Sequence, residues 1–198
     1  TESRQLVREG WGIRDTDKLI GLVGRLDPMK DHPTFLAAVA LLIRKRENIR
    51  FVCVGDGSQH YRHELYTLSS QLGLDKYLIW EGMREDMPAV HNAFDIACSS
   101  SYGEGFPNVI GEAMACGIPC VVTDVGDSRL IVGETGFVVP PKDPENLAMR
   151  LNDFLNMSKA EIAQRGAAAR ERIVRNYGTD VLIDQTAKML ASLVQEGL

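Results

Sequence analysis

Two basic residues of this 198-residue sequence stand just after a predicted buried strand, where they could act on a ligand. Arg25 and Lys30 lie five positions apart in the turn after the first apolar run. A planar guanidinium and a compact ammonium group together suit two neighbouring phosphates. Taken alone, the pair is also typical of a solvated loop with ordinary surface charges, so its interpretation depends on what faces it.

An acidic pair, Glu104 and Glu112, lies in the segment 99–119 with seven residues between the two carboxylates. Glycines flank Glu104, and Pro107 suits the first position of a helix whose free N–H groups stabilise phosphate. Glu104 could accept hydrogen bonds from sugar hydroxyls or stabilise positive charge at a sugar carbon. Glu112 could accept from two vicinal ribose hydroxyls. The two charged pairs together predict a sugar-nucleotide site.

The alternative for the acidic pair is a solvated loop residue at Glu104 and a helix-surface charge at Glu112. Asn108 and Glu112 are four positions apart and therefore share one face of the predicted helix. The apolar neighbours of Glu112, from Val109 to Cys116, predict that the helix is largely covered there. A covered carboxylate is costly unless it has a partner, and this favours the functional interpretation.

The elements that must position these side chains alternate along the chain. Short apolar strands separated by helices indicate a parallel sheet covered on both faces, with right-handed crossovers. We therefore predict an α/β fold: a Rossmann-like doubly wound parallel sheet of about six strands with C-terminal helices. Its ligands bind beyond the carboxyl ends of the strands. The expected strands cover residues 19–24, 50–55, 77–81, 94–99, 118–123 and 136–139, and the expected helices cover 33–45, 59–72, 87–93, 108–116, 144–156, 159–176 and 180–195.

Composition limits the class of protein. The net charge is −5, with 44% apolar and 25% charged residues, so nothing indicates nucleic acid or an anionic membrane as a partner. No apolar stretch approaches the roughly 20 residues of a membrane helix. Cys53, Cys98 and Cys120 lie in apolar, strand-like surroundings, which are typical of reduced core cysteines and of a cytoplasmic protein.

The sequence contains no complete motif for a dinucleotide cofactor or for a zinc site. The turn Gly55-Asp56-Gly57 does not match G-x-G-x-x-G, and no other segment supplies that fingerprint behind a strand, so a nicotinamide or flavin cofactor is not expected. Cys116 and Cys120 have a loose metal-ligand spacing, but no second Cys/His pair completes a zinc site. We expect neither a metal nor a cofactor.

Five blocks of the sequence, in order, resemble the retaining family 4 glycosyltransferases, also called glycosyl transferases group 1. The resemblance covers about residues 19–155. It implies a GT-B enzyme, in which two Rossmann-like domains face each other across the active site, and it makes this chain the C-terminal, nucleotide-sugar-binding domain. The blocks are residues 23–30, 54–57, 82–88, 104–119 and 123–126.

Carried over position by position, the resemblance implies three catalytic residues. Arg25 and Lys30 bind the donor diphosphate and stabilise the departing nucleotide, whose negative charge grows in the transition state. Glu104 contacts the transferred sugar. Two positions depart from the family pattern, Asp127 in place of a glycine and Cys120 in place of a valine, and both lie outside the implied donor site.

The resemblance also implies further donor-binding positions. Backbone amides after Glu104 lie near sugar hydroxyls and phosphate, Val109 lies near phosphate or ribose, and Glu112 holds the ribose. The loop after the third strand lines the base pocket, largely through backbone contacts. The amides belong to Gly105, Phe106 and Asn108, and the base-pocket residues are Met83 and Arg84.

The function implied is transfer of a sugar from a nucleoside-diphosphate sugar to an acceptor, with retention, by a hexosyltransferase without metal or cofactor. Residues 1–17 lead in from a missing N-terminal acceptor domain, 18–157 form the donor-binding domain, and 158–198 form helices that pack on it or reach toward the missing half. The isolated chain is expected to bind nucleotide or nucleotide sugar weakly and to transfer nothing. The location implied is cytoplasmic, with peripheral membrane association through the missing domain.

Two other functions remain open from the sequence. One is an epimerase of sugar nucleotides, or a phosphorylase, of the same fold. The other is a nucleotide-binding regulatory module without catalysis. The base, the sugar and the acceptor are also left open, because backbone contacts dominate base recognition in the family.

Overall fold

A parallel sheet is the framework that positions the candidate residues. The computed structural model describes residues 2–195 and contains six parallel strands in the order β3-β2-β1-β4-β5-β6. β1 pairs with β2 on one side and with β4 on the other, so the winding direction changes between β1 and β4. This confirms the predicted doubly wound fold, which places ligands at that change. The strands are β1 (Lys18–Val23), β2 (Ile49–Val54), β3 (Leu78–Glu81), β4 (Ile96–Ser99), β5 (Cys120–Thr123) and β6 (Phe137–Val139).

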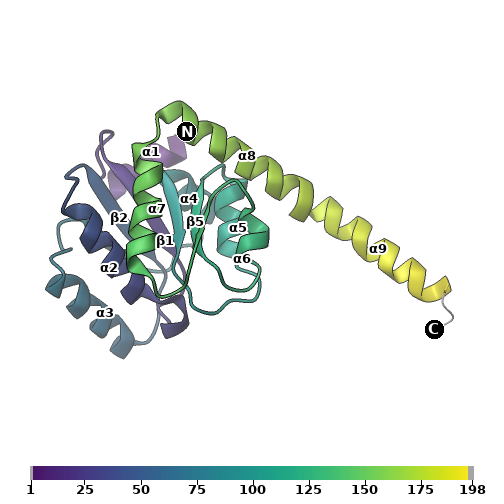
Figure 1. The fold of residues 1–198 in the computed structure, drawn as a ribbon, viewed down its shortest axis with the longest axis horizontal. Coiled ribbons are helices and arrows are strands. Elements are labelled where there is room, and N and C mark those ends of the chain that lie inside the picture. Colours follow the sequence, from purple (N-terminus) through teal and green to yellow (C-terminus); the bar gives the residue numbers. More distant parts are fainter. Residues whose placement is uncertain (1, 196–198) are drawn as a thin grey trace.

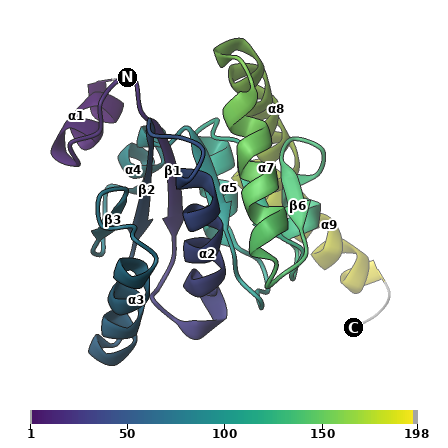
Figure 2. The same cartoon turned by 60° about the vertical axis from the view of Figure 1, so that its left-hand side comes forward.

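Helices cover both faces of the sheet, as Figures 1 and 2 show. One layer holds α2, α3 and α7, and the other holds α1, α4, α5, α6 and α8. The helices are α1 (Glu2–Gly10), α2 (His32–Ile43), α3 (Gln59–Gln71), α4 (Met87–Ala93), α5 (Asn108–Ala115), α6 (Ser128–Val132), α7 (Pro144–Asn156), α8 (Lys159–Tyr177) and α9 (Thr179–Gln195), with a 3₁₀ turn η1 at Pro28–Lys30.

Two cores form because successive strand residues point to opposite faces. Leu19 and Val52 pack in the layer of α1, α4, α5, α6 and α8, whereas Ile20 and Phe51 pack in the layer of α2, α3 and α7. All four side chains are fully buried. Burial of strand residues on both faces explains why the strands read as continuous apolar runs.

Element ends follow the expected local signals. Asp31 caps α2, because its side chain accepts from the backbone N–H of Thr34. Gly73 and Gly117 follow α3 and α5 with φ of +73° and +76°, conformations that favour glycine. Pro107 is the residue before α5, one position earlier than predicted, and it caps the helix without a side-chain hydrogen bond. The short elements α6 and η1 were not predicted, because neither is long enough to show a periodic pattern.

The strand cysteines belong to the core as predicted. Cys53, Cys98 and Cys120 are buried free thiols. Burial raises the pKa of each thiol, to about 12 for Cys120, so all three stay protonated near neutral pH.

The C-terminal helices confirm the predicted breaks after residues 157 and 177. α7 packs on α2, and α8 packs on α5. α8 passes so close to the turn after α5 that a Cβ on Gly166 would lie 2.0 Å from the carbonyl oxygen of Gly117. Residues 1 and 196–198, at the ends of the predicted leading and C-terminal segments, lie outside the described range.

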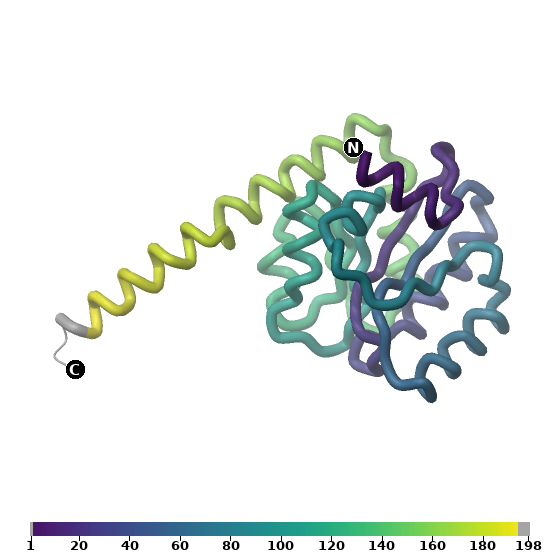
Figure 3. The backbone as a smooth tube through the Cα atoms, turned by 180° about the vertical axis from the view of Figure 1, so that it is seen from behind, coloured from purple at the N-terminus to yellow at the C-terminus, as the bar shows by residue number. Residues whose placement is uncertain are grey.

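α9 extends away from the rest of the domain, as Figures 1 and 3 show. It is separated from α8 by Gly178, which has an extended conformation. Four apolar side chains of α9 are each at least 55% exposed: Leu182, Ile183, Met189 and Leu190. No helix within residues 2–195 combines the length and the apolar character needed to cross a bilayer.

Candidate active site

The loop after β1 is a stiff support for Lys30. Asp27 accepts a hydrogen bond from the N–H of Met29 within the turn η1. Asp31 then turns the chain into α2 through a left-handed conformation with φ of 48°. The stem of Lys30 crosses Gly24, where an added Cβ would lie 3.4 Å from Lys30 Cδ. The hydrogen bonds of this turn hold the backbone at Lys30, and the aliphatic stem lies over Gly24.

The loop after β4 brings Glu104 to that lysine. Lys30 Nζ lies 2.6 Å from Glu104 Oε1, and their side chains are only 18% and 12% exposed. Ser101 Oγ donates to the same carboxylate oxygen at 2.7 Å. We call Lys30 and Glu104 the carboxyl-edge pair. It lies where the winding direction of the sheet changes, between the loops that follow β1 and β4.

Backbone contacts join these two loops. Ser100 Oγ donates to the carbonyl oxygens of Lys30 and Asp31, each at 2.9 Å. The N–H of Tyr102 donates to the carbonyl of Met29 at 3.0 Å. The relative position of Lys30 and Glu104 is therefore set by the fold as well as by their own ion pair.

The loop after β5 supports Glu104 from the other side. Thr123 Oγ1 donates to the carbonyl of Ser101. Gly126 has φ of +50°, and a Cβ there would lie 2.3 Å from the carbonyl oxygens of Glu104 and Gly105. The N–H of Asp127 donates to the carbonyl of Gly105 at 2.9 Å. Only glycine at position 126 permits this approach without movement of the backbone.

Arg25 does not join the carboxyl-edge pair. Its side chain is exposed and lines a separate hollow of about 450 Å³ between the loop after β1 and the start of α3. Asp56, His60 and Glu64 line the same hollow. The structure thus places the two predicted cations on one loop, with one of them paired to Glu104 and the other turned to a neighbouring surface.

Glu112 corrects an expectation from the sequence. Its side chain is 50% exposed instead of covered, because it emerges from α5 at the boundary with α4. Within the protein, Glu112 has a partner that the sequence did not predict, since His91 Nε2 on α4 lies 3.4 Å from Glu112 Oε2.

The remaining predicted positions lie at the same edge of the sheet but do not form one contact cluster. Met83 is 79% exposed in the loop after β3. Arg84 is engaged by Glu81 at 3.0 Å and by Asp86 at 2.7 Å. Hydrogen bonds to Asp86 and Glu81 raise the pKa of Arg84. Gly105, Phe106 and Asn108 are exposed between β4 and α5, and Val109 is half-buried.

Three supporting hydroxyl groups were not identified from the sequence. Ser100, Ser101 and Thr123 stand at the ends of β4 and β5 and are buried. The run of serines at the carboxyl end of β4 was a usable signal. Nothing local marks Thr123, because its role depends on the pairing of β4 with β5.

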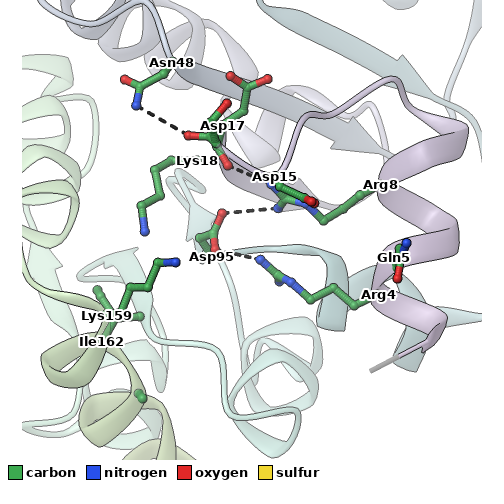
Figure 4. A pocket seen from close by; sticks show the side chains of 12 residues that line it. Arg4, Gln5, Arg8, Asp15, Asp17, Lys18, Asn48, Asp95, Lys159 and Ile162 are labelled. Carbon is green, nitrogen blue, oxygen red and sulfur yellow. Dashed lines mark hydrogen bonds and ion pairs between the residues drawn. The ribbon is translucent and has the colours of Figure 1, made fainter.

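A second cavity lies at the opposite edge of the sheet (Figure 4). It measures about 870 Å³ and is lined by residues near the amino ends of β1, β2 and β4. Asp95 accepts from Arg4 at 2.8 Å, from Arg8 at 3.3 Å and from the N–H of Leu19 at 2.8 Å. We call Arg4, Arg8 and Asp95 the amino-edge clamp, because it ties α1 to the base of the sheet.

An Asp-x-Asp triplet, Asp15-Thr16-Asp17, also borders this cavity. The expectation of chemistry without a metal assumed that the sequence contains no Asp-x-Asp motif, and that assumption was wrong. Asp17 is held by Arg14 at 2.7 Å, and this contact lowers the pKa of the Asp17 carboxyl. Across residues 2–195, no three side chains of the types that bind metals come together.

The fold and the site define a class: a doubly wound α/β domain with a partly buried lysine–glutamate pair at the carboxyl edge of its sheet. The model of the family described as "Glycosyl transferases group 1" matches residues 17–157. The chain belongs to this family.

Known proteins of this kind are similar over nearly the whole chain. A D-inositol 3-phosphate glycosyltransferase of Corynebacterium efficiens is 35% identical and is matched over 96% of this chain and 45% of its own length. HepE of Anabaena, solved in complex with UDP-glucose, has a TM-score of 0.87 at 26% identity, over 96% of this chain and 53% of its own. The C-terminal domain of LpcC, a glycosyl transferase group 1 family protein of Francisella tularensis, has the same fold, with a TM-score of 0.79 at 24% identity over 90% of this chain and 95% of its own. The chain thus spans about half the length of the larger proteins.

Proposed function

We propose that this chain is the donor-binding half of a retaining family 4 glycosyltransferase, which transfers a hexose from a nucleoside-diphosphate sugar to an acceptor. The carboxyl-edge pair is the observation that carries the proposal. Lys30 offers three N–H donors and Glu104 engages one of them, so the others are available to phosphate oxygens. The carboxylate of Glu104 retains lone pairs for sugar hydroxyls.

The proposed roles follow from this geometry. Lys30 meets the negative charge that develops on the departing nucleotide, and its fixed stem means that little reorganisation is needed at that moment. Arg25 reaches the diphosphate from its exposed position on the same loop. Glu104 orients the transferred sugar, and Glu112 holds the ribose.

The remaining donor contacts in the proposal come from backbone groups. The amides of Gly105, Phe106 and Asn108 face the sugar and the phosphates, and the helix α5 that begins there favours an anion. Val109 lies beside the phosphate or ribose, and the loop of Met83 and Arg84 lines the base pocket. Support for the last assignment is that the side chain of Arg84 is already engaged, which leaves its backbone.

The domain organisation belongs to the same proposal. Residues 18–157 bind the donor, 1–17 lead in from an N-terminal acceptor domain, and 158–198 include α9, whose exposed apolar side chains suit contact with that domain. The match to about half of each larger relative supports a second half. The isolated chain accordingly binds donor and transfers nothing.

We further propose that the reaction uses no metal ion and no organic cofactor, since Lys30 and Arg25 supply the positive charge that the diphosphate requires. A cytoplasmic location, with peripheral membrane contact through the N-terminal domain, completes the proposal. Its support is the set of buried, unoxidised cysteines.

A calorimetric titration of the 198-residue chain tests the function. Uridine, guanosine and adenosine diphosphates are each compared with their glucose conjugates. We expect one base to bind, with the conjugate tighter than the bare diphosphate, and we expect Glu104→Gln to remove that preference. Glu134→Gln, at an exposed position of the turn after α6, is the matched control.

Three outcomes contradict the proposal. Absence of binding for every nucleotide and conjugate removes the donor site. Binding without preference for the sugar conjugate favours a regulatory nucleotide module. Robust sugar transfer by this chain alone removes the need for an N-terminal half.

A further inference from the structure

A buried histidine lies behind the half-exposed Glu112. His91 is on α4 with a side chain only 2% exposed, and its Nε2 lies 3.4 Å from Glu112 Oε2. The ring of Phe94 meets the His91 ring edge-on, with centroids 5.8 Å apart and planes at 85°. His91 is therefore the fixed member of this pair, and Glu112 is the member that faces solvent.

The surroundings of His91 select one protonation state. A carboxylate only accepts hydrogen bonds, so Nε2 carries the proton that faces Glu112. Nδ1 is buried and has no hydrogen-bond partner within the described part of the chain. A second proton on Nδ1 would create a buried, unpartnered N–H. Burial accordingly lowers the pKa of His91, although Glu112 acts in the opposite direction. The neutral ring of His91 therefore keeps an N–H donor directed at the Glu112 carboxylate.

We propose that His91 is a positioning residue for the nucleotide: its Nε2–H holds Glu112 in the rotamer that presents the carboxylate to the ribose hydroxyls. The inference rests on the proposed role of Glu112. An exposed glutamate loses rotamer freedom when a ligand immobilises it. The hydrogen bond from His91 restrains Oε2 before the ligand binds, and this reduces the entropy that Glu112 loses on binding. Oε1 remains free to accept from the two ribose hydroxyls.

The contact engages only one oxygen of the carboxylate. His91 Nε2 lies 3.4 Å from Oε2, so Oε1 keeps its capacity to accept from a ligand. A histidine that only filled the core would be replaced by an apolar side chain without any effect on ribose recognition. That difference separates the two roles.

The experiment is a double-mutant cycle on the 198-residue chain with His91→Leu, Glu112→Ala and the combination. The probes are uridine, guanosine and adenosine diphosphates, each beside its 2′,3′-dideoxy form. His91→Gln retains an amide donor of similar reach and serves as the conservative variant. Thermal unfolding checks the fold of each variant, and His91→Met replaces His91→Leu if the latter does not fold.

We expect His91→Leu to weaken binding of the ribonucleotide about three- to tenfold, to leave the dideoxy form unchanged, and to have no further effect beside Glu112→Ala. His91→Gln should bind within about twofold of the parent chain. Equal binding by His91→Leu, a loss that persists beside Glu112→Ala, or an equal loss for the dideoxy form overturns the positioning role. If Glu112→Ala itself leaves ribose discrimination intact, the proposed role of Glu112 fails, and this inference fails with it.

Discussion

The two ends of the sheet carry charge clusters built in opposite ways. In the amino-edge clamp, Arg8 is 6% exposed and donates to Asp95 and to the carbonyls of Ala93, Arg14 and Asp17. In the carboxyl-edge pair, Lys30 has Glu104 as its one side-chain acceptor among residues 2–195. The buried guanidinium of the first cluster is held by several protein acceptors, and the lysine of the second has a single side-chain acceptor. The first arrangement favours a structural role, and the second fits the donor site proposed above.

The largest effect is expected from a substitution in the amino-edge clamp, to which we assign a structural role. Asp95→Ala leaves the buried guanidinium of Arg8 without its carboxylate and the N–H of Leu19 without an acceptor. We expect the free energy of unfolding to fall by about 3–4 kcal/mol, measured by urea denaturation. Nucleotide affinity of the molecules that remain folded should not change. A drop in affinity would mean that the clamp also acts on the ligand edge.

The second prediction concerns a buried histidine beside the ligand edge. His32 begins α2, is fully buried, and has no hydrogen-bond partner for either ring nitrogen within residues 2–195. Burial lowers its pKa from 6.5 to about 4, with the charge of Lys30 acting in the same direction. Between these values the unfolded chain binds more protons than the folded chain, so stability falls as the pH falls.

The expected contribution of His32 is about 3 kcal/mol lost between pH 7 and pH 4. His32→Leu should remove that part of the acid sensitivity in urea denaturation at several pH values. His60→Gln is the matched control, because the side chain of His60 is 86% exposed. The same pH dependence in parent and His32→Leu chains would contradict the prediction.

The third prediction tests whether the carboxyl-edge pair binds a ligand. Lys30→Met keeps the aliphatic stem over Gly24 and removes the charge. We expect the affinity for the preferred nucleoside diphosphate to fall by about tenfold to thirtyfold, or about 2 kcal/mol. Lys18→Met, at the other end of β1, should bind like the parent chain. Equal losses in the two variants would show only a general effect of charge.

The smallest effect is expected at Ser101. Ser101→Ala removes a donor to Glu104 and leaves the ion pair with Lys30 in place. We expect a loss of about 1 kcal/mol in binding of the sugar conjugate, seen by calorimetry, with less change for the bare diphosphate. An equal loss for both ligands would mean that Ser101 supports the loop rather than the orientation of Glu104.

The sequence predicted the fold better than the site. Strand and helix periods and the breaks in the last third are local properties, and the structure confirms them. The ligand edge depends on contacts between distant segments. His91 and Glu112 are 21 positions apart, and Thr123 supports Ser101 across the pairing of β4 with β5. No spacing rule on one strand or helix reports such pairs.

The dependence of the site on contacts between distant segments also explains why Glu112 and Arg25 lie differently from what the sequence suggested. The apolar neighbours of Glu112 suggested cover, but α4 reaches only one side of that carboxylate and supplies a histidine there. Arg25 and Lys30 share a loop, yet the turn η1 between them directs their side chains to different surfaces. Loop conformation decided the case of Arg25, and the packing of α4 against α5 decided the case of Glu112.

The glycine contact between α8 and α5 has a mechanical consequence. Gly166 allows α8 to lie directly on the backbone of Gly117, so the closest approach of α8 to the domain is made by two residues without side chains. The end of α9 lies roughly 40 Å further along the chain at 1.5 Å per residue. A methyl group at position 166 would change the angle between α8 and the rest of the domain at their point of contact. A change of a few degrees in that angle would move the end of α9 by several ångströms.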